Sequence, residues 1–146
     1  MNIFIDANVL LDVLARREPF YADSAQVWTL AETGRIAGFI SAISLSNLFY
    51  LMRRMKGQKA ARKAIGILRD IFNLVPFDRQ ITNQAIDSDI RDFEDAIQFF
   101  SAIRVGATVL ITRNPKDFPS TDIAIQTPTE FLATHCPEKK DTRAKE

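Results

Sequence analysis

Residues 107–112 constrain the fold more than any other stretch, because they form a continuous run of apolar and β-branched residues. Such a run is typical of a strand that is covered on both faces of a parallel sheet. Other short apolar runs recur along the chain, and segments with apolar residues at helical spacing separate them. The strands that we expect are residues 2–5, 36–41, 74–77, 107–112 and 123–125.

This alternation predicts an α/β fold, a three-layer α/β/α sandwich with a central and mostly parallel sheet. We expect one domain over residues 1–134 and a flexible charged tail over residues 135–146, because the chain lacks apolar anchors after Pro137. Ser44 is expected to cap the helix that follows the second strand. The expected helices span residues 8–14, 20–33, 44–56, 59–72, 81–90, 93–105 and 127–133.

The composition excludes several classes of protein. Hydrophobic residues make up 47% and charged residues 25% of the chain, as in ordinary globular proteins. No apolar run is long enough to span a membrane and no signal pattern is visible, so we expect a cytoplasmic protein without membrane contact. The single histidine, His135, and the single cysteine, Cys136, argue against a zinc site and against a Ser-His-Asp triad. An enzyme of this composition would have to use carboxylates.

Carboxylates occur where predicted strands and helices meet. Asp6 follows the first strand, Asp92 and Asp95 open the helix over residues 93–105, and Asn114 and Asp117 follow residues 107–112. Helix capping explains each position locally. However, parallel strands bring such junctions to one edge of a sheet. We expect the Asp6, Asp95 and Asp117 carboxylates to converge on one hard cation, Mg²⁺ or Mn²⁺.

Other polar residues near these junctions have less definite roles. Asn47 lies early in the helix that follows the second strand and could face the same edge. Asp12, one turn beyond the first junction, could support the site, but we favour an ordinary solvent-facing position for it. Glu94 is expected to face solvent as well, because helical spacing turns it away from Asp95.

The charges are sorted along the chain although the net charge is only +1. Seven basic residues and no acidic residue lie between positions 53 and 69, whereas six acidic residues lie between positions 78 and 95. The basic helices could form a solvated surface or could bind the phosphates of a nucleic acid. The candidate RNA-binding residues are Arg53, Arg54, Lys56 and, next to Asn114, Arg113.

Four stretches, taken together, resemble the PIN-domain family of metal-dependent ribonucleases, which includes the toxins of VapBC-type toxin–antitoxin pairs. They are residues 5–12, 92–96, 110–118 and 127–132, they lie in the family's order, and the resemblance covers residues 2 to about 133. It implies a compact α/β/α sandwich with an acidic cluster that binds Mg²⁺ or Mn²⁺ and cleaves RNA.

The resemblance also implies roles for individual residues. Asp6 and Asp95 match the first and third acids of the family, and Asp92 would support Asp95. The last acidic position falls within residues 114–117, where we favour Asp117 as the carboxylate with Asn114 assisting. The implied function is a metal-dependent endoribonuclease, the toxin of a toxin–antitoxin pair, with an RNA substrate, an antitoxin partner and a homodimeric state.

One departure from the family pattern supports an alternative. The family usually has Glu where this chain has Asn47, and an amide oxygen can bind a cation but adds no negative charge. The alternative is a catalytically weak or inactive PIN-fold binding module that acts through dimer or antitoxin contacts. A receiver domain or DxD-type phosphatase would need a second acid at position 7 or 8, where Ala7 and Asn8 stand.

Overall fold

The computed structural model describes residues 1–136, and a five-stranded sheet lies at its centre. Every pair of neighbouring strands is parallel, in the order β3-β2-β1-β4-β5, which confirms the expected parallel sheet. The run at 107–112 contains β4, which has a neighbouring strand on each side. The strands are β1 (Asn2–Ile5), β2 (Ala37–Ser41), β3 (Asn73–Val75), β4 (Val109–Ile111) and β5 (Ala124–Gln126).

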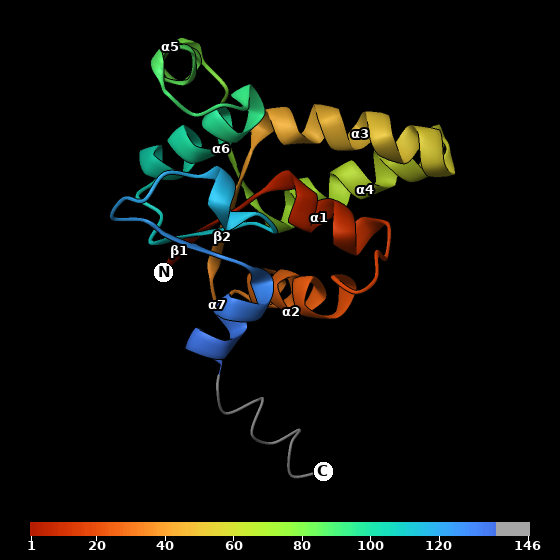
Figure 1. Cartoon of the computed structure of the whole chain (residues 1–146). Coiled ribbons are helices and arrows are strands. Elements are labelled where there is room, and N and C mark those ends of the chain that lie inside the picture. The colour runs from red at the N-terminus through yellow and green to blue at the C-terminus, as the bar shows by residue number, and fades with distance from the viewer. Residues whose placement is uncertain (137–146) are drawn as a thin grey trace.

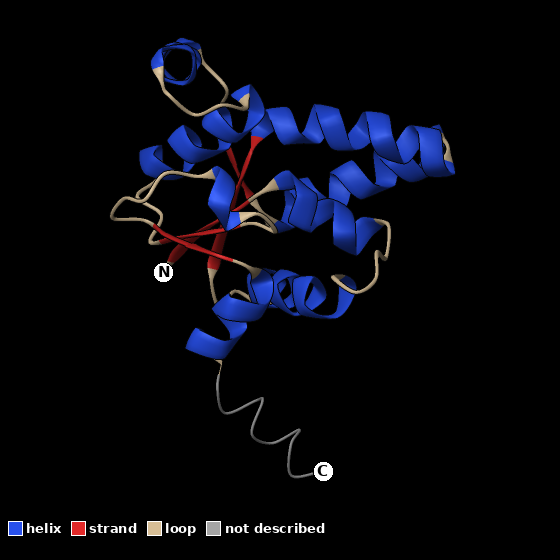
Figure 2. Ribbon diagram, in the orientation of Figure 1, coloured by secondary structure: helices blue, strands red, loops and turns tan. Residues whose placement is uncertain are grey.

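Helices cover both faces of this sheet, which confirms the predicted α/β/α sandwich (Figures 1 and 2). The helices α3 and α4 run side by side and project together beyond the sheet (Figure 1). A short 3₁₀ helix, η1 (Pro115–Asp117), follows β4. The α-helices are α1 (Ala7–Leu14), α2 (Tyr21–Glu32), α3 (Ala42–Lys56), α4 (Gln58–Ile71), α5 (Arg79–Asp87), α6 (Phe93–Arg104) and α7 (Pro128–His135).

The two apolar cores follow from the alternation of side chains along the central strands. Ile3 and Ile5 of β1 enter the core beneath α1, α2, α3, α4 and α7, whereas Phe4 enters the core beneath α5 and α6. All three side chains are fully buried or nearly so, because β1 is covered on both faces and paired on both edges. This burial fixes where the carboxyl end of β1 emerges.

The described chain ends just after α7. Cys136 is partly buried and packs against the core beneath α7, and the rest of the predicted tail, residues 137–146, lies outside the described residues. Within residues 1–136, none of the helices has the length and apolar character needed to cross a membrane.

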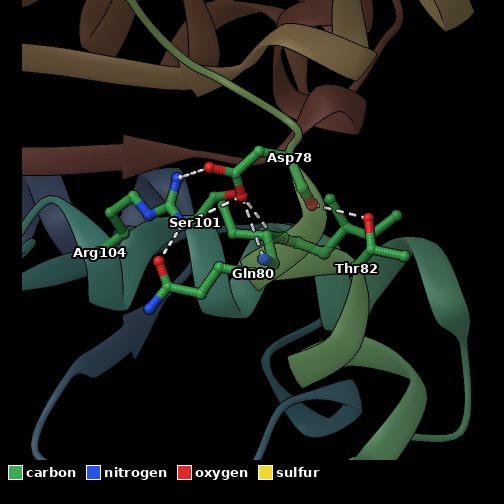
Figure 3. A network of polar contacts seen from close by, with 7 residues as sticks. Asp78, Gln80, Thr82, Ser101 and Arg104 are labelled. Carbon is green, nitrogen blue, oxygen red and sulfur yellow. Dashed lines mark hydrogen bonds and ion pairs between the residues drawn. The ribbon is translucent and has the colours of Figure 1, made fainter.

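A polar network holds α5 against α6 (Figure 3). The Arg104 guanidinium donates to Asp78, with Nη1 2.7 Å from Oδ2, and also to Gln80. Asp78 accepts a further hydrogen bond from the backbone N–H of Ile81 and so caps α5. The hydrogen bonds from Arg104 lower the pKa of Asp78. This network fixes the last residue of α6, at the opposite end of that helix from Asp92.

A buried hydrogen bond joins α3 to α6 closer to their first turns. Ser41, rather than Ser44, occupies the N-cap position of α3, so the expectation for Ser44 is wrong. The Ser44 hydroxyl instead accepts a hydrogen bond from Gln98 Nε2 at 3.0 Å, and both side chains are fully buried. Helical spacing alone could not show this, because the partner comes from a helix far along the chain.

We predict that Ser44→Ala lowers the free energy of unfolding by about 1–2 kcal/mol, because the buried Gln98 amide loses its acceptor. Ser46→Ala, at an exposed position of α3, serves as the matched control and should change it by less than about 0.5 kcal/mol. The double variant Ser44→Ala/Gln98→Leu should recover most of the loss. Urea denaturation measures all three, and equal stability of the two single variants would contradict the prediction.

Candidate active site

Asp6 lies at the carboxyl end of β1 with its side chain almost completely buried. The register pairs Ile5 with Ile111, so the next residues of the two strands, Asp6 and Thr112, also meet. The Thr112 hydroxyl donates to Asp6 Oδ2 at 2.8 Å. Asp6 is the N-cap residue of α1, as the capping interpretation expects, although no side-chain capping hydrogen bond is formed. Burial raises the pKa of Asp6 to about 6, although the Thr112 hydrogen bond opposes the shift. The backbone N–H groups of Ala7 and Asn8 also lower the pKa of this carboxyl group.

The first turn of α6 holds a second pair of acids. Asp92 is the N-cap residue, and its Oδ1 accepts the backbone N–H of Asp95 at 2.9 Å, as the capping interpretation expects. That bond fixes the turn that carries the half-buried Asp95 carboxylate. Burial raises the pKa of Asp95 to about 7, and the negative charges of Asp6, Asp92 and Asp117 add to the shift. Acids from three separate segments are therefore close enough to repel one another.

The third segment follows β4. Thr112 Oγ1 accepts the backbone N–H of Asn114 at 3.2 Å while it donates to Asp6, so one hydroxyl orients both the buried acid and the loop. Asn114 and Asp117 are exposed, and η1 carries Asp117 to the side of the cluster where Asp95 lies. Sequence reasoning did not single out Thr112. The available signal was its place as the last residue of the predicted central strand.

A shallow hollow in the surface is lined by Asp92, Asp95 and Asp117 together with Arg91 and Lys116. The buried Asp6 does not line it, but its charge acts on Asp95. We use the name acidic cluster for Asp6, Asp92, Asp95 and Asp117.

Glu94 adds to this cluster. It is exposed, as expected, but its charge raises the pKa of both Asp6 and Asp95. Its expected exposure to solvent is confirmed, although its charge still acts on the two acids. Helical spacing separates Glu94 from Asp95 on α6 itself, but it does not show that β1 ends beside the same turn.

The structure separates the predicted RNA-binding residues from the acidic cluster. Arg53, Arg54 and Lys56 are exposed in the last turn of α3, at the far end of the α3–α4 hairpin (Figure 1). They lie roughly 18 Å along the helix axis from its start at the sheet edge, because each helical residue advances about 1.5 Å. Asn47 lies between, half-buried in the second turn of α3. Within residues 1–136 its side chain forms no hydrogen bond.

Arg113 has an internal partner that the sequence did not reveal. Its Nε lies 3.1 Å from Oδ2 of Asp12, and its guanidinium lies over the ring of Phe20, 4.6 Å from the centroid. Asp12 is completely buried, so its expected solvent-facing position is wrong. Burial raises the pKa of Asp12, and the charge of Arg113 counteracts part of the shift. The pair ties α1 to the loop that also carries Thr112.

The donor chemistry of the acidic cluster suits a divalent cation, although the side chains do not enclose one. Among residues 1–136, no group of three or more Asp, Glu, His or Cys side chains is close enough to hold a metal ion. The expected convergence of three carboxylates is therefore not present. Mg²⁺ commonly keeps several waters and binds through only one or two carboxylates. Asp6 and Asp95, whose pKa values are raised to about 6 and 7, fit such a hydrated cation.

Comparison with known proteins identifies the family. A family model described as PIN domain matches residues 2–116, which is most of the chain. The chain belongs to the PIN-domain family. Among curated protein sequences, none matches this chain significantly.

Solved structures share the PIN fold. DNA-bound VapBC from Salmonella typhimurium has a TM-score of 0.66 at 16% identity and covers 88% of this chain and 98% of its own. A toxin–antitoxin complex from Klebsiella pneumoniae has a TM-score of 0.65 at 22% identity and covers 86% and 97%. VapC20 from Mycobacterium tuberculosis, a sarcin–ricin loop cleaving toxin, has a TM-score of 0.61 at 20% identity and covers 74% and 86%. At these identities the likeness establishes the fold.

Because the PIN fold places all of these acids at one edge, the metal-free protein should lose stability as the pH rises. The pKa values of Asp6 and Asp95 are raised from 3.8 to about 6 and about 7, so the folded state binds protons more tightly than the unfolded state over that range. In EDTA, the Tm should therefore be higher at pH 5.5 than at pH 8. Asp95→Asn should reduce this difference, and circular dichroism melts measure it. An unchanged difference in Asp95→Asn would contradict the assignment.

The Asp12–Arg113 pair gives a second prediction. Arg113→Met should lower the free energy of unfolding by roughly 3 kcal/mol at neutral pH, because it leaves a buried carboxylate without its counter-charge. The double variant Asp12→Leu/Arg113→Met should be more stable than Arg113→Met, since no buried charge remains. Urea denaturation compares the two variants. A double variant that is no more stable than Arg113→Met would show that the ion pair is not what stabilises this region.

Proposed function

We propose that this protein is a metal-dependent endoribonuclease that hydrolyses RNA phosphodiester bonds and acts as the toxin of a toxin–antitoxin pair. The observation that carries the proposal is the mutual repulsion at the acidic cluster, where burial and neighbouring charges raise the pKa of Asp95 to about 7. A purely structural arrangement gains nothing from placing acids of three segments together, whereas a divalent cation would neutralise them. Membership of the PIN-domain family supports the same reaction.

In this proposal Asp6 and Asp95 would hold a hydrated Mg²⁺ or Mn²⁺, Asp117 would complete the site and Asn114 would assist it. The ion, when bound, polarises the phosphodiester and lowers the pKa of the attacking water. Thr112 keeps the Asp6 carboxylate oriented through its hydrogen bond to Oδ2. Asp92 holds the first turn of α6 through its bond to the Asp95 N–H, and the Asp95 carboxylate accepts the proton that the attacking water loses.

The proposal includes partners. The similar structures from Salmonella and Klebsiella are a VapBC assembly and a toxin–antitoxin complex, so we propose an antitoxin partner for this chain. Homodimerisation and a cytoplasmic location remain predictions from the sequence. The assignment of Arg53, Arg54, Lys56 and Arg113 to RNA also remains a prediction, and the distance of the first three from the acidic cluster does not favour it.

Asn47 supports a second candidate, a PIN-fold binding module with weak or absent catalysis. An amide at this place adds no negative charge to the acidic cluster, so the affinity for a cation would be lower than with Glu. The two candidates differ in one measurable property, which is whether Asp95 matters for RNA cleavage.

We predict that the purified protein cleaves RNA in the presence of Mn²⁺ or Mg²⁺, and that the cleavage stops when EDTA removes the metal ion. Asp6→Asn and Asp95→Asn should each reduce the rate by at least about 100-fold, because each removes a group that would hold the ion or the proton. Asp87→Asn, at an exposed position at the end of α5, is the charge-matched control and should cleave at the wild-type rate. If the wild type and Asp95→Asn cleaved RNA at the same rate, the proposal of an endoribonuclease active site at the acidic cluster would be wrong. The proposal of a PIN-fold binding module would then remain.

A further inference from the structure

Two cations border the acidic cluster. Arg91 and Lys116 line the same hollow as Asp92, Asp95 and Asp117, and both side chains belong to exposed residues. Among residues 1–136, neither forms an ion pair with an acid, although carboxylates lie beside both. Their charges are therefore available to an anion that comes from outside the protein.

A second hollow adjoins the first. It shares Arg91, Lys116 and Asp117 with the acidic hollow, so the two hollows adjoin at these residues, and together they are called the groove below. Each hollow encloses a volume of about 360–380 Å³, which is in the range of small-molecule sites. The remaining lining of the second hollow is mostly apolar and aromatic, with two polar side chains, Ser88 and Asp89, beside Ile90, Phe99, Phe100, Phe118 and Pro119.

The order of chemical groups along this groove matches a single-stranded nucleic acid. Lys and Arg neutralise backbone phosphates, and apolar or aromatic surfaces accept unpaired bases. Asp92 and Asp95 line only the first hollow, most of the apolar side chains line only the second, and Arg91, Lys116 and Asp117 border both. The basic block at the far end of α3 also has an aromatic neighbour, since the Arg54 guanidinium lies 5.8 Å from the centroid of the Tyr50 ring. However, Arg53, Arg54 and Lys56 line neither of the two hollows that contain the acids.

We propose that Arg91 and Lys116 bind the phosphates beside the bond that is cut, and that the apolar hollow next to them holds one unpaired base of the RNA. The inference rests on the endoribonuclease function proposed above. It adds which residues bind the phosphates of the substrate and which hollow holds a base. Substrate selection then favours single-stranded character at the position next to the cut, because a paired base would first have to be unpaired and unstacked to enter the hollow.

RNA binding without cleavage tests the phosphate contacts. A fluorescein-labelled single-stranded oligoribonucleotide is titrated in EDTA with Asp95→Asn, which removes one repelling carboxylate, and anisotropy gives the Kd. In the Asp95→Asn protein, the further substitutions Arg91→Gln and Lys116→Gln should weaken RNA binding at least about tenfold. They should also reduce the slope of the logarithm of the association constant against the logarithm of the salt concentration by about 1.4. Arg35→Gln/Arg79→Gln removes the same charge from exposed positions away from the groove and should leave the Kd at the reference value.

The base contact is tested with a chemically simpler probe. An abasic oligomer of the same length should bind about tenfold more weakly than the normal RNA, because it lacks the base that stacks in the hollow. Phe100→Leu keeps an apolar side chain at a half-buried position but removes the ring, so it should reduce this preference. Binding of the abasic oligomer itself should stay unchanged in Phe100→Leu, which separates loss of stacking from loss of folding.

The outcomes distinguish this inference from the proposed function. If Arg53→Gln/Arg54→Gln weakens binding and Arg91→Gln/Lys116→Gln does not, the groove is not the binding site, whereas Asp95-dependent cleavage would still stand. An equal Kd for normal and abasic oligomers overturns the base contact. If the protein neither binds nor cleaves RNA, the groove and the nuclease function are both wrong.

Discussion

The hydrogen bond from Thr112 to the buried Asp6 carboxylate is the contact on which the rest of the site depends. It joins the ends of β1 and β4, the two adjacent strands from which the loops of the site continue. A carboxylate at this position is unfavourable without help, because burial penalises its charge. Asp95 and Asp117 lie near this buried carboxylate. Their negative charges add electrostatic repulsion to the cost of burial instead of compensating for it. In the proposed function, a bound cation would relieve this repulsion.

Much of the fold could be predicted from local patterns. The strands are short apolar runs covered on both faces, and the helices follow the 3.6-residue spacing, so each element can be recognised from its own residues. Asp6 and Asp95 were found for a related reason, since residues at strand-to-helix junctions of parallel sheets meet at one edge. The order of the strands in the sheet could not be predicted in this way. The spacing of residues within one strand does not show which other strands pair with it.

The misassigned residues share a physical cause. Asp12 and Ser44 are polar residues on helices, and each is buried because one partner, Arg113 or Gln98, reaches it from far along the chain. The assignment of the basic block to RNA remains a prediction, and the length of α3 places that block at a distance from the start of the helix. Conversely, Arg91 and Lys116 were overlooked because they stand among acids in the sequence. What matters for binding is which charges lack a partner in space.

The Asp6–Thr112 contact also has a consequence in time. Its two residues are separated by 106 positions. At about 5–20 residues per second, the ribosome needs on the order of 5–20 s to make the second after the first. During that interval β1 and α1 lack their contacts with β4. The Asp6 carboxyl group therefore remains exposed to water. The burial that perturbs the pKa of Asp6 begins when β4 docks, so that shift requires a chain made at least as far as Thr112.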